Sequence, residues 1–255
     1  MDDVLDVWQL NLQHGKSSTA VLAKNLARVD NAVVLIQEPW VKHDSILGLN
    51  IRNCSMFKGT GYQNPCTCII TKGVKSVYCL PQFCDRNSTV VCISYCTMGQ
   101  VKEIVVASIY MPIDEQVITG YLDSLVQYCN ANNKHLIIGA DTNAHHILWG
   151  SDSCNHRGNE LCEYLASTSL EVANVGNQPT FCTGNRRTVI DVMLVTRPIL
   201  REINNWHVAR HDTMSDHRQI TFTLRCDKPA RFRCRNKKKT DWLKYDTELS
   251  SRIGM

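Results

Sequence analysis

Apolar residues along the chain fall into many short runs and few long periodic segments. Helical spacing occurs in only three segments: one that follows a cap at Ser17 or Ser18, and those at 119–132 and 158–167. Many strands with three helices favour an α/β sandwich of two sheets over a doubly wound parallel fold. No glycine-rich phosphate loop follows the first strand, which disfavours a nucleotide-cofactor enzyme. The strand-like runs are 5–12, 32–38, 67–71, 74–80, 89–95, 103–111, 135–139, 171–174, 188–195, 205–210 and 219–225.

The composition is that of a folded domain. Of 255 residues, 44% are hydrophobic and 20% are charged, so the chain has enough apolar side chains to offset the entropy of ordering. No run approaches the ~18 apolar residues of a membrane helix. The acidic start, Met1 to Val4, also lacks the apolar segment of a secretory signal. We therefore expect no membrane partner.

Positive charge is concentrated at the C-terminal end. Residues 225–255 contain ten Lys and Arg against four Asp and Glu, a net charge of +6, whereas residues 1–224 contain 18 against 20, a net charge of −2. We predict one folded domain over 1–225 and a basic tail over 226–255. The tail fits attraction to phosphate or a nuclear-import signal as well as it fits a solvated linker to a further domain.

The cysteines predict no zinc knuckle. There are 13 of them, and their spacings do not form two pairs of the CxxC type. A metal cluster of Cys154 and His156 with His145 and His146 is conceivable from proximity in the sequence. Scattered structural thiols in a reducing compartment explain the pattern better, because many of the cysteines lie inside apolar runs.

Polar residues interrupt or end five of the predicted strands. Their positions are Asn11, Glu38, the pair Asp141 and Asn143, Asp191, and the dipeptide Asp216-His217. A carboxylate within a buried strand is costly unless it is paired, hydrogen-bonded or bound to a metal. Five such interruptions indicate one shared polar site at an edge of the sheets.

Phosphodiester hydrolysis is the chemistry that needs this set of side chains. A divalent cation requires hard oxygen ligands, which Glu38, Asn11 and Asp216 supply. A histidine oriented by a carboxylate activates water, and Asp191 and His217 are candidates for that pair.

Each position taken alone has an ordinary explanation. A glutamate before proline commonly ends a strand, and Asp-x-Asn after a strand commonly forms a turn. Asp191 could be a buried acid that pairs with Arg187, and Asp-His dipeptides often cap turns. The order of the whole set along the chain is therefore the informative feature.

That order resembles the endonuclease/exonuclease/phosphatase superfamily. The resemblance covers about residues 5–224 and is carried by six motifs in order. They are Gln9-Leu10-Asn11, Ile36-Gln37-Glu38-Pro39, Ser108-Ile109-Tyr110-Met111-Pro112, Gly139-Ala140-Asp141-Thr142-Asn143-Ala144-His145, Val189-Ile190-Asp191-Val192 and Ser215-Asp216-His217. It implies a DNase-I-like, four-layer α/β sandwich in which two packed mixed β-sheets are flanked by helices.

Further runs resemble the apurinic-endonuclease-like domain of non-LTR, LINE-type retrotransposons, especially those of insects. They are Asn143-Ala144-His145-His146, Trp149-Gly150 and Gln178-Pro179-Thr180-Phe181. The resemblance implies a metal-dependent endonuclease that nicks one strand of double-stranded DNA. The 3′-hydroxyl so formed would prime reverse transcription by the element's own reverse transcriptase domain, which would follow the basic tail. It also implies a nuclear location, and Mg²⁺ as the cofactor with Mn²⁺ as a substitute.

The resemblance also implies roles for individual residues. Glu38 would be the main metal ligand, helped by Asn11 and Asp216, while Gln13 stands where some members carry a second acidic ligand. His217 would contact the scissile phosphate or activate water, and Asp191 would orient His217. Asp141 would position the nucleophile or serve the leaving group. Asn143 would hold the phosphate, and Tyr110 would bond a phosphate oxygen through its hydroxyl. A tyrosine packed in the core is the alternative for Tyr110.

Contacts to DNA are expected from loops around this site. Residues 182–187 predict a hairpin tip, and its Arg186 and Arg187 suit a phosphate track or a narrow groove. Without the resemblance, ordinary surface arginines would explain them. The expected DNA-binding residues are Asn185, Arg186, Arg187, His145 and Thr180, with Arg157, Lys42 and His43 as weaker candidates.

Two other functions stay open at this point. One is an abasic-site repair endonuclease or a phosphomonoesterase of the same superfamily. The other is a nucleic-acid-binding module without turnover, although such a module gains nothing from acidic groups beside phosphate.

Overall fold

Two mixed β-sheets of six strands form the centre of the structure. The structure is a computed structural model that describes residues 3–74, 76–97 and 100–226 together with Trp242, Lys244, Thr247 and Ser250. The first sheet has the order β15 (Ile203–Val208), β16 (Ile220–Cys226), β1 (Asp3–Asn11), β2 (Ala32–Gln37), β6 (Thr67–Lys72) and β5 (Cys54–Phe57). The second has the order β11 (Leu170–Val172), β14 (Asp191–Thr196), β10 (His135–Asp141), β9 (Gln100–Tyr110), β8 (Ser88–Thr97) and β7 (Ser76–Cys79).

Each sheet contains one parallel pair among antiparallel neighbours. In the first sheet β1 runs parallel to β2, and in the second β9 runs parallel to β10. Carboxyl ends of parallel strands lie at the same edge of a sheet. Asn11 and Gln37 are therefore partners at one end of the first sheet, and Tyr110 and Asp141 are partners at one end of the second.

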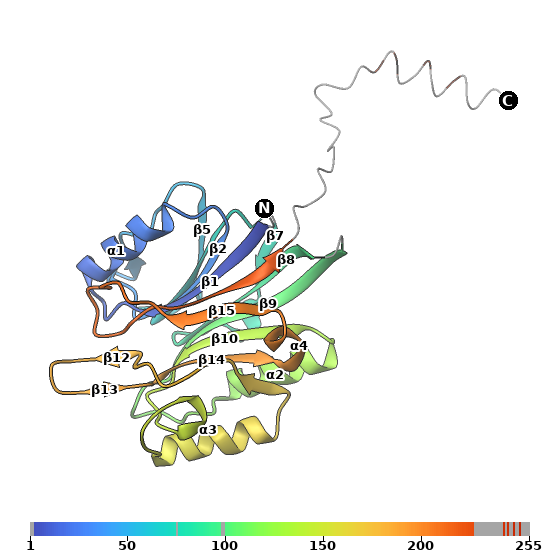
Figure 1. The fold of residues 1–255 in the computed structure, drawn as a ribbon. Coiled ribbons are helices and arrows are strands. Elements are labelled where there is room, and N and C mark those ends of the chain that lie inside the picture. Colours follow the sequence, from blue (N-terminus) through green and yellow to red (C-terminus); the bar gives the residue numbers. More distant parts are fainter. Residues whose placement is uncertain are drawn as a thin grey trace.

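Helices cover the outer faces of both sheets (Figure 1). Helix α1 (Lys16–Leu26) lies on the first sheet, and α2 (Gly120–Ala131) and α3 (His156–Ala166) lie on the second. Apolar side chains fill all three spaces between these layers, and the central one holds residues such as Leu35, Ile69, Ile137 and Met193. The expected four-layer α/β sandwich of the DNase-I type is confirmed.

The two sheets approach closely near the polar ends of their strands. A Cβ atom on Gly139 of β10 would lie 2.6 Å from Cδ1 of Leu35 on β2, so a larger residue at Gly139 would force the Leu35 side chain to move. Gln37 bridges the same gap, because its amide nitrogen donates to the Ser108 hydroxyl at 3.0 Å and to the Gly139 carbonyl at 2.9 Å.

The helix starts differ in part from those predicted. The α1 helix begins at Lys16 after Gly15, so neither serine caps it; instead Ser18 is buried and donates its hydroxyl to the Leu12 carbonyl. Thr119 caps α2 as expected. The α3 helix begins at His156, two residues before the predicted start, because the Asn155 side chain accepts the Gly158 N–H. The short helix α4 (Arg197–Leu200) was not predicted.

The remaining elements are short. Two hairpins, β3 (Val41–Lys42) with β4 (Ser45–Ile46) and β12 (Phe181–Cys182) with β13 (Arg187–Thr188), stand apart from the large sheets, and the second projects from the body (Figure 1). Two 3₁₀ turns lie at η1 (Pro81–Phe83) and η2 (Ile147–Trp149).

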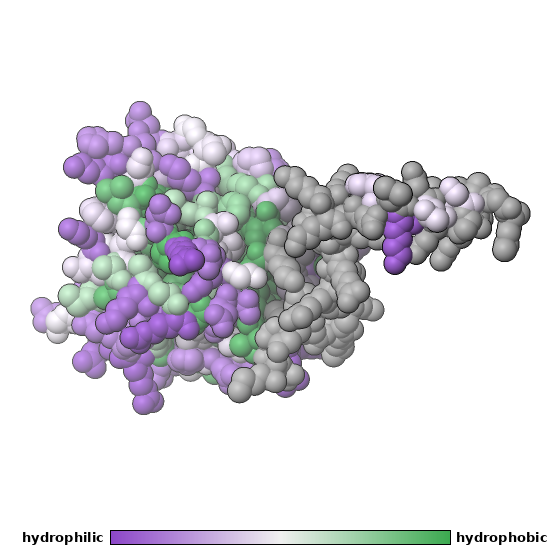
Figure 2. Space-filling model, turned by 90° about the horizontal axis from the view of Figure 1, so that it is seen from above, coloured by the Kyte–Doolittle hydropathy of each residue, from purple (hydrophilic) through white to green (hydrophobic). Residues whose placement is uncertain are grey.

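Hydrophilic residues dominate the margins of the face seen in Figure 2 and hydrophobic ones are grouped towards its middle. Of the helices in the described ranges, none has the length and apolar character needed to cross a membrane. The basic run 231–239 lies outside the described residues, so the role of the tail stays a prediction.

Candidate active site

The polar residues that end the central strands meet at one end of the sandwich. Asn11 ends β1, Glu38 follows β2, and Tyr110 and Asp141 end β9 and β10. Asp191 begins β14, which is antiparallel to β10, and the register places it directly opposite Asp141. Residues far apart in the sequence are therefore adjacent because strand polarity brings their ends together.

Asp141 is the link between the two sheets. It is buried, and its Oδ2 accepts a hydrogen bond from the Asn11 amide at 2.8 Å, although the two residues are 130 positions apart. Its Oδ1 accepts the backbone N–H of Asn143 at 3.3 Å. Burial, with the nearby carboxylate of Asp191, raises the pKa of Asp141 well above its ordinary range. A carboxylate in this setting accepts a proton more readily than an exposed one.

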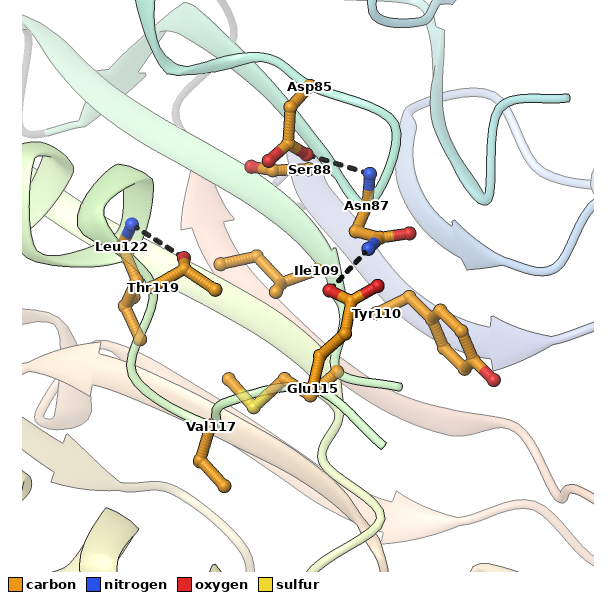
Figure 3. Close-up of a pocket in the computed structure, with 10 residues that line it drawn as sticks. Asp85, Asn87, Ser88, Ile109, Tyr110, Glu115, Val117, Thr119 and Leu122 are labelled. Carbon is orange, nitrogen blue, oxygen red and sulfur yellow. Dashed lines mark hydrogen bonds between the residues drawn. The ribbon is translucent and has the colours of Figure 1, made fainter. Parts of the chain in front are cut away.

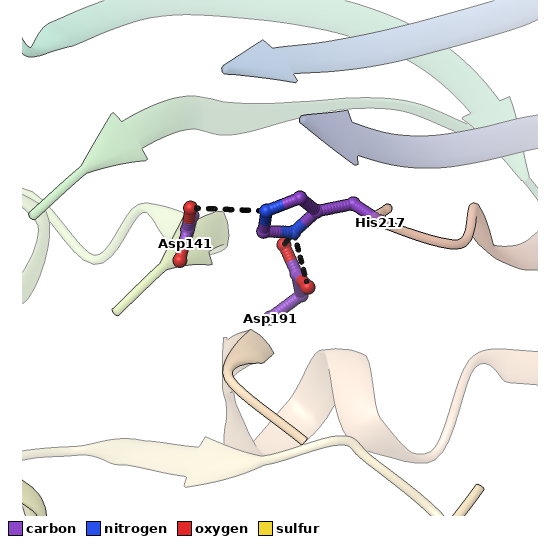
Figure 4. A group of neighbouring side chains, drawn as sticks. All are labelled: Asp141, Asp191 and His217. Carbon is purple, nitrogen blue, oxygen red and sulfur yellow. Dashed lines mark hydrogen bonds and ion pairs between the residues drawn. The ribbon is translucent and has the colours of Figure 1, made fainter. Parts of the chain in front are cut away.

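His217 is held between two carboxylates (Figure 4). Its Nδ1 lies 2.9 Å and 3.1 Å from the two oxygens of Asp191, and its Nε2 lies 3.9 Å from Oδ2 of Asp141. All three side chains are buried. Burial lowers the pKa of His217, but the carboxylates, Asp191 first, outweigh it and raise the pKa to about 9. The pair predicted from sequence, Asp191 with His217, is present, and the alternative pairing of Asp191 with Arg187 is not seen.

The backbone around this pair is fixed by buried hydroxyls. The Thr180 hydroxyl accepts the N–H groups of Ile190 and Asp191 at 3.1 and 3.0 Å. The Thr213 hydroxyl donates to the carbonyl of His217 at 2.6 Å. The expectation that Thr180 contacts DNA is therefore wrong, because its side chain is fully buried and holds the Asp191 strand.

Glu38 occupies the same end of the first sheet. Its backbone has a φ of 45°, a left-handed conformation that costs a non-glycine residue about 1–3 kcal/mol and is often found at functional sites. Gln13, His14 and Asn143 share this conformation, with φ values of 48°, 53° and 46°. The Glu38 carboxylate lies 3.6 Å from Nε2 of His14. The pKa of Tyr110 is raised first by the burial of its own side chain and then by the negative charge of Glu38. Tyr110 is thus half-buried beside Glu38 and not in the apolar core.

Asp216 is exposed and is held by Gln13, a residue that sequence reasoning treated only as a lost ligand. The Gln13 side chain donates to Oδ2 of Asp216 at 3.2 Å and accepts its backbone N–H at 2.8 Å. The backbone N–H of Gln13 donates to Oδ1 of Asn11 at 2.8 Å. The Ser215 hydroxyl donates to the Asn11 carbonyl at 2.8 Å. These contacts join the Asp216 loop to the end of β1, and no sequence motif marks them.

The donor set at this end of the first sheet fits a hard divalent cation. Glu38 offers a partly exposed carboxylate, and Asn11 and Asp216 add oxygens that Gln13 ties to one place. Mg²⁺ commonly uses one or two protein carboxylates and keeps several waters, which an accessible site allows. Among the described His, Cys, Asp and Glu side chains, Asp141, Asp191 and His217 form the only group of three whose ligand atoms all lie within 4.8 Å of one another. In that group Nδ1 of His217 is already engaged by Asp191.

The thiols give no second metal centre in the described part of the chain. The ten cysteines whose side chains the structure describes are free, and one of them, Cys154, is exposed. His145 does not face Cys154 or His156 but bonds two residues of the β12–β13 hairpin.

The predicted hairpin is confirmed over residues 181–188. Asn185, Arg186 and Arg187 are exposed at its tip, which leaves them free to contact a substrate. Its first strand is tied to the Asp216–His217 loop, since the Cys182 N–H donates to the Asp216 carbonyl at 2.7 Å and the Phe181 ring packs against the His217 ring at 4.9 Å.

Arg157, a weaker candidate for DNA contact, has a different place. Its guanidinium donates to the carbonyls of Met111 and Thr142, both at 3.2 Å, and to those of Ile113 and Glu115. It therefore joins the loop after Tyr110 to the loop that carries Asn143. Lys42 and His43 are exposed on the β3–β4 hairpin.

A small pocket is lined in part by Tyr110 (Figure 3). Its polar rim includes Asp85, Asn87 and Glu115, and the Asn87 amide donates to Glu115 at 3.2 Å. The Tyr110 ring points away from it. The pocket thus lies beside the catalytic group and does not contain Asp141, Asp191 or His217.

Comparison with known proteins agrees with this geometry. A family profile described as endonuclease-reverse transcriptase matches residues 104–221. The solved endonuclease domain of TRAS1, a telomere-specific non-LTR retrotransposon, is similar with 31% identity and a TM-score of 0.73, over 88% of this chain and 100% of that one. A search of curated proteins finds none that matches.

More distant structures share the fold. The catalytic domain of Xenopus laevis APE2 is 14% identical with a TM-score of 0.69, over 90% of this chain and 94% of that one. The AP endonuclease LMAP from Leishmania major is 12% identical with a TM-score of 0.64, over 87% and 88%.

Proposed function

Because the chain belongs to the family of endonuclease domains of non-LTR retrotransposons, we propose that it is a Mg²⁺-dependent enzyme that nicks one strand of double-stranded DNA. Hydrolysis of the P–O3′ bond would leave a 3′-hydroxyl that primes reverse transcription by the element's own reverse transcriptase domain. The observation that carries the proposal is the bonded series Asn11, Asp141, His217 and Asp191 beside Glu38, at one end of both sheets. A nuclear location follows from a chromosomal substrate and is part of the proposal.

The residues divide the reaction between them. Asp191 accepts the Nδ1–H of His217, so the ring is held with Nε2 towards Asp141 and the substrate. With its pKa raised to about 9, His217 is protonated at neutral pH and donates from Nε2 to an oxygen of the scissile phosphate. Asp141 holds the attacking water and takes its proton, which its raised pKa favours.

The surrounding residues bind and orient the phosphate. The Tyr110 hydroxyl lies near Glu38 and Asp141, and the Asn143 side chain is fixed by its bond to the Met111 carbonyl; both would contact the phosphate. Glu38, Asn11 and Asp216 would hold Mg²⁺, or Mn²⁺ in its place. When bound, the cation supplies positive charge that polarises the phosphoryl oxygen and neutralises the leaving O3′.

Nicking of supercoiled plasmid in Mg²⁺ tests the proposal. Wild-type protein should convert supercoiled to open-circular DNA, EDTA should stop it, and Glu38→Gln and His217→Ala should reduce the rate at least about 100-fold. Asp30→Asn, at the opposite end of β2 from Glu38, is the matched control and should cut at the wild-type rate. Equal activity in all four proteins would contradict the assigned roles.

The chemistry of the nick tests the priming step. A DNA polymerase should extend the nicked strand without prior phosphatase treatment, because a 3′-hydroxyl is present. A nick that is extended only after a 3′-phosphate is removed would contradict the proposed bond cleavage. A duplex that contains one abasic site, cut much faster than intact DNA, would instead favour a repair enzyme.

A further inference from the structure

His145 connects the loop after Asp141 to the tip of the β12–β13 hairpin. Its Nε2 lies 3.0 Å from Nη2 of Arg186, and its Nδ1 lies 2.9 Å from the hydroxyl of Thr188. His145 follows Asp141 by four residues, whereas Arg186 is 41 residues further along the chain. Both ring nitrogens are therefore used within the protein.

Hydrogen-bond chemistry fixes the state of this ring. Arginine only donates, so Nε2 of His145 must carry a lone pair. Nδ1 then carries the proton and donates to the Thr188 hydroxyl. The ring is neutral, and burial and the Arg186 guanidinium both lower the pKa of His145 in agreement with this.

The backbone of His145 is itself held rigidly. Its N–H donates to the Asn155 side chain at 3.0 Å, and its carbonyl accepts the Asn155 N–H at 3.0 Å. A Cβ atom at Gly158 would lie 1.9 Å from the His145 carbonyl oxygen, so the first turn of α3 packs directly on this residue. His145 thus has a fixed position relative to Asp141.

The hairpin has few other contacts that fix its second strand. Its two strands have two residues each, paired as Phe181 with Thr188 and Cys182 with Arg187. The first strand is tied to the Asp216–His217 loop. The bonds of His145 to Arg186 and Thr188 supply a corresponding tie for the second strand.

We propose that His145 is a positioning residue that holds Arg186, and with it the hairpin, at a set place relative to Asp141 and His217. It acts through Arg186 and does not itself contact the substrate, unlike the expectation from sequence. One N–H of Arg186 is used by His145, and the others remain for a DNA phosphate. The DNA part rests on the proposed function, and the consequence is that His145 sets which phosphate reaches the catalytic group.

Binding and cleavage by His145→Ala, Arg186→Ala and the double variant test this role. Each single change should weaken duplex binding, measured by fluorescence anisotropy in EDTA, by about 5–10-fold, and should raise KM while kcat stays within about twofold. The double variant should bind no more than about twofold weaker than either single one, because both remove the same contact. His145→Gln, which keeps one acceptor and one donor, should recover part of the lost affinity.

Hydrogen exchange gives a readout that needs no substrate. The backbone amides of residues 181–188 should exchange faster in His145→Ala than in wild type, with circular dichroism unchanged. His135→Ala is the matched control, because His135 lies at the opposite end of β10 from Asp141. It should alter neither exchange of the hairpin nor binding.

Three results would overturn the assignment of His145. They are unchanged exchange of the hairpin in His145→Ala, additive losses in the double variant, and a large fall in kcat at unchanged KM, which would indicate direct catalysis. Wild-type protein that neither binds nor nicks duplex DNA would contradict the proposed function alone. Hydrogen exchange would then still decide whether His145 holds the hairpin.

Discussion

Replacement of Asp191 by asparagine separates the charge of this residue from its shape. Asp191 is buried, and both of its oxygens lie within 3.1 Å of Nδ1 of His217. Asparagine has nearly the same volume, and its carbonyl oxygen can still accept the Nδ1–H of His217, but it carries no negative charge. Its amide can also donate to Nδ1, which would move the ring proton to Nε2 and reverse the roles of the two nitrogens.

The expected loss follows from the electrostatics of His217. Its pKa is raised from 6.5 to about 9, although burial alone lowers it. This corresponds to roughly 3 kcal/mol of stabilisation of the imidazolium, in which Asp191 is the largest contributor. At ~1.4 kcal/mol per tenfold in rate, the loss of that charge lowers kcat about 100-fold. A reversed tautomer adds to this, and the analogous change in a serine-protease triad costs about 10⁴-fold, so we expect a loss between these values with little change in KM.

Single-turnover nicking of plasmid at saturating enzyme measures this loss directly. The assay compares wild type, Asp191→Asn, His217→Ala and the control Asp30→Asn, and circular dichroism checks that each protein is folded. The view that Asp191 acts through His217 would be refuted by one combination of results. In it, Asp191→Asn nicks at a rate within about threefold of wild type, while His217→Ala nicks at least about 100-fold more slowly.

Three further predictions concern stability and metal binding. Glu38→Gln should abolish the rise in Tm that Mg²⁺ causes in wild type, measured by differential scanning fluorimetry, and a retained rise would place the metal elsewhere. Gly150→Ala should lower the free energy of unfolding by about 1–3 kcal/mol in urea titrations, because Gly150 has a φ of 93° and a Cβ there would lie 2.3 Å from the Gly176 carbonyl oxygen; unchanged stability would contradict this. His217 in the folded metal-free protein binds its proton more tightly than in the unfolded chain, so the free energy of unfolding should fall as the pH rises from about 6.5 to about 9. The raised pKa of Asp141 should likewise make the free energy of unfolding fall with rising pH, but at lower pH values. Tm values across this range check it, and His217→Asn should flatten the dependence.

Much of the fold could be predicted because burial leaves a periodic trace in the sequence. All six residues of β2 and all but the first of β10 are buried, and both appear as continuous apolar runs. The start of α1 was missed because its cap is Gly15, which forms no side-chain bond, while Ser18 turns inward to Leu12. A serine near a helix start looks the same in either role until the turn before it is known.

The order of polar residues along the chain was enough to predict that these side chains lie close together. Each stands at the end of a strand, and strand polarity then places Asn11, Glu38, Asp141 and Asp191 at one edge. Sequence reasoning failed where a role depends on which way a side chain points. Thr180 was expected at the DNA surface but is fully buried behind Asp191.

The sequence by itself determined the layers, through hydrophobic periodicity, and the family, through polar residue types in a fixed order, and that order also predicted the pair of Asp191 with His217. Only the tertiary structure decided most of the other contacts among the polar side chains at this end of the sandwich. Asn11 bonds Asp141, which is 130 positions away, and Gln13 bonds Asp216, which is 203 positions away. His145 and Arg186, which also bond each other, are 41 positions apart. Such contacts depend on strand register and on the left-handed turns at Gln13, Glu38 and Asn143, which are set by packing of the whole domain and leave no local pattern in the chain.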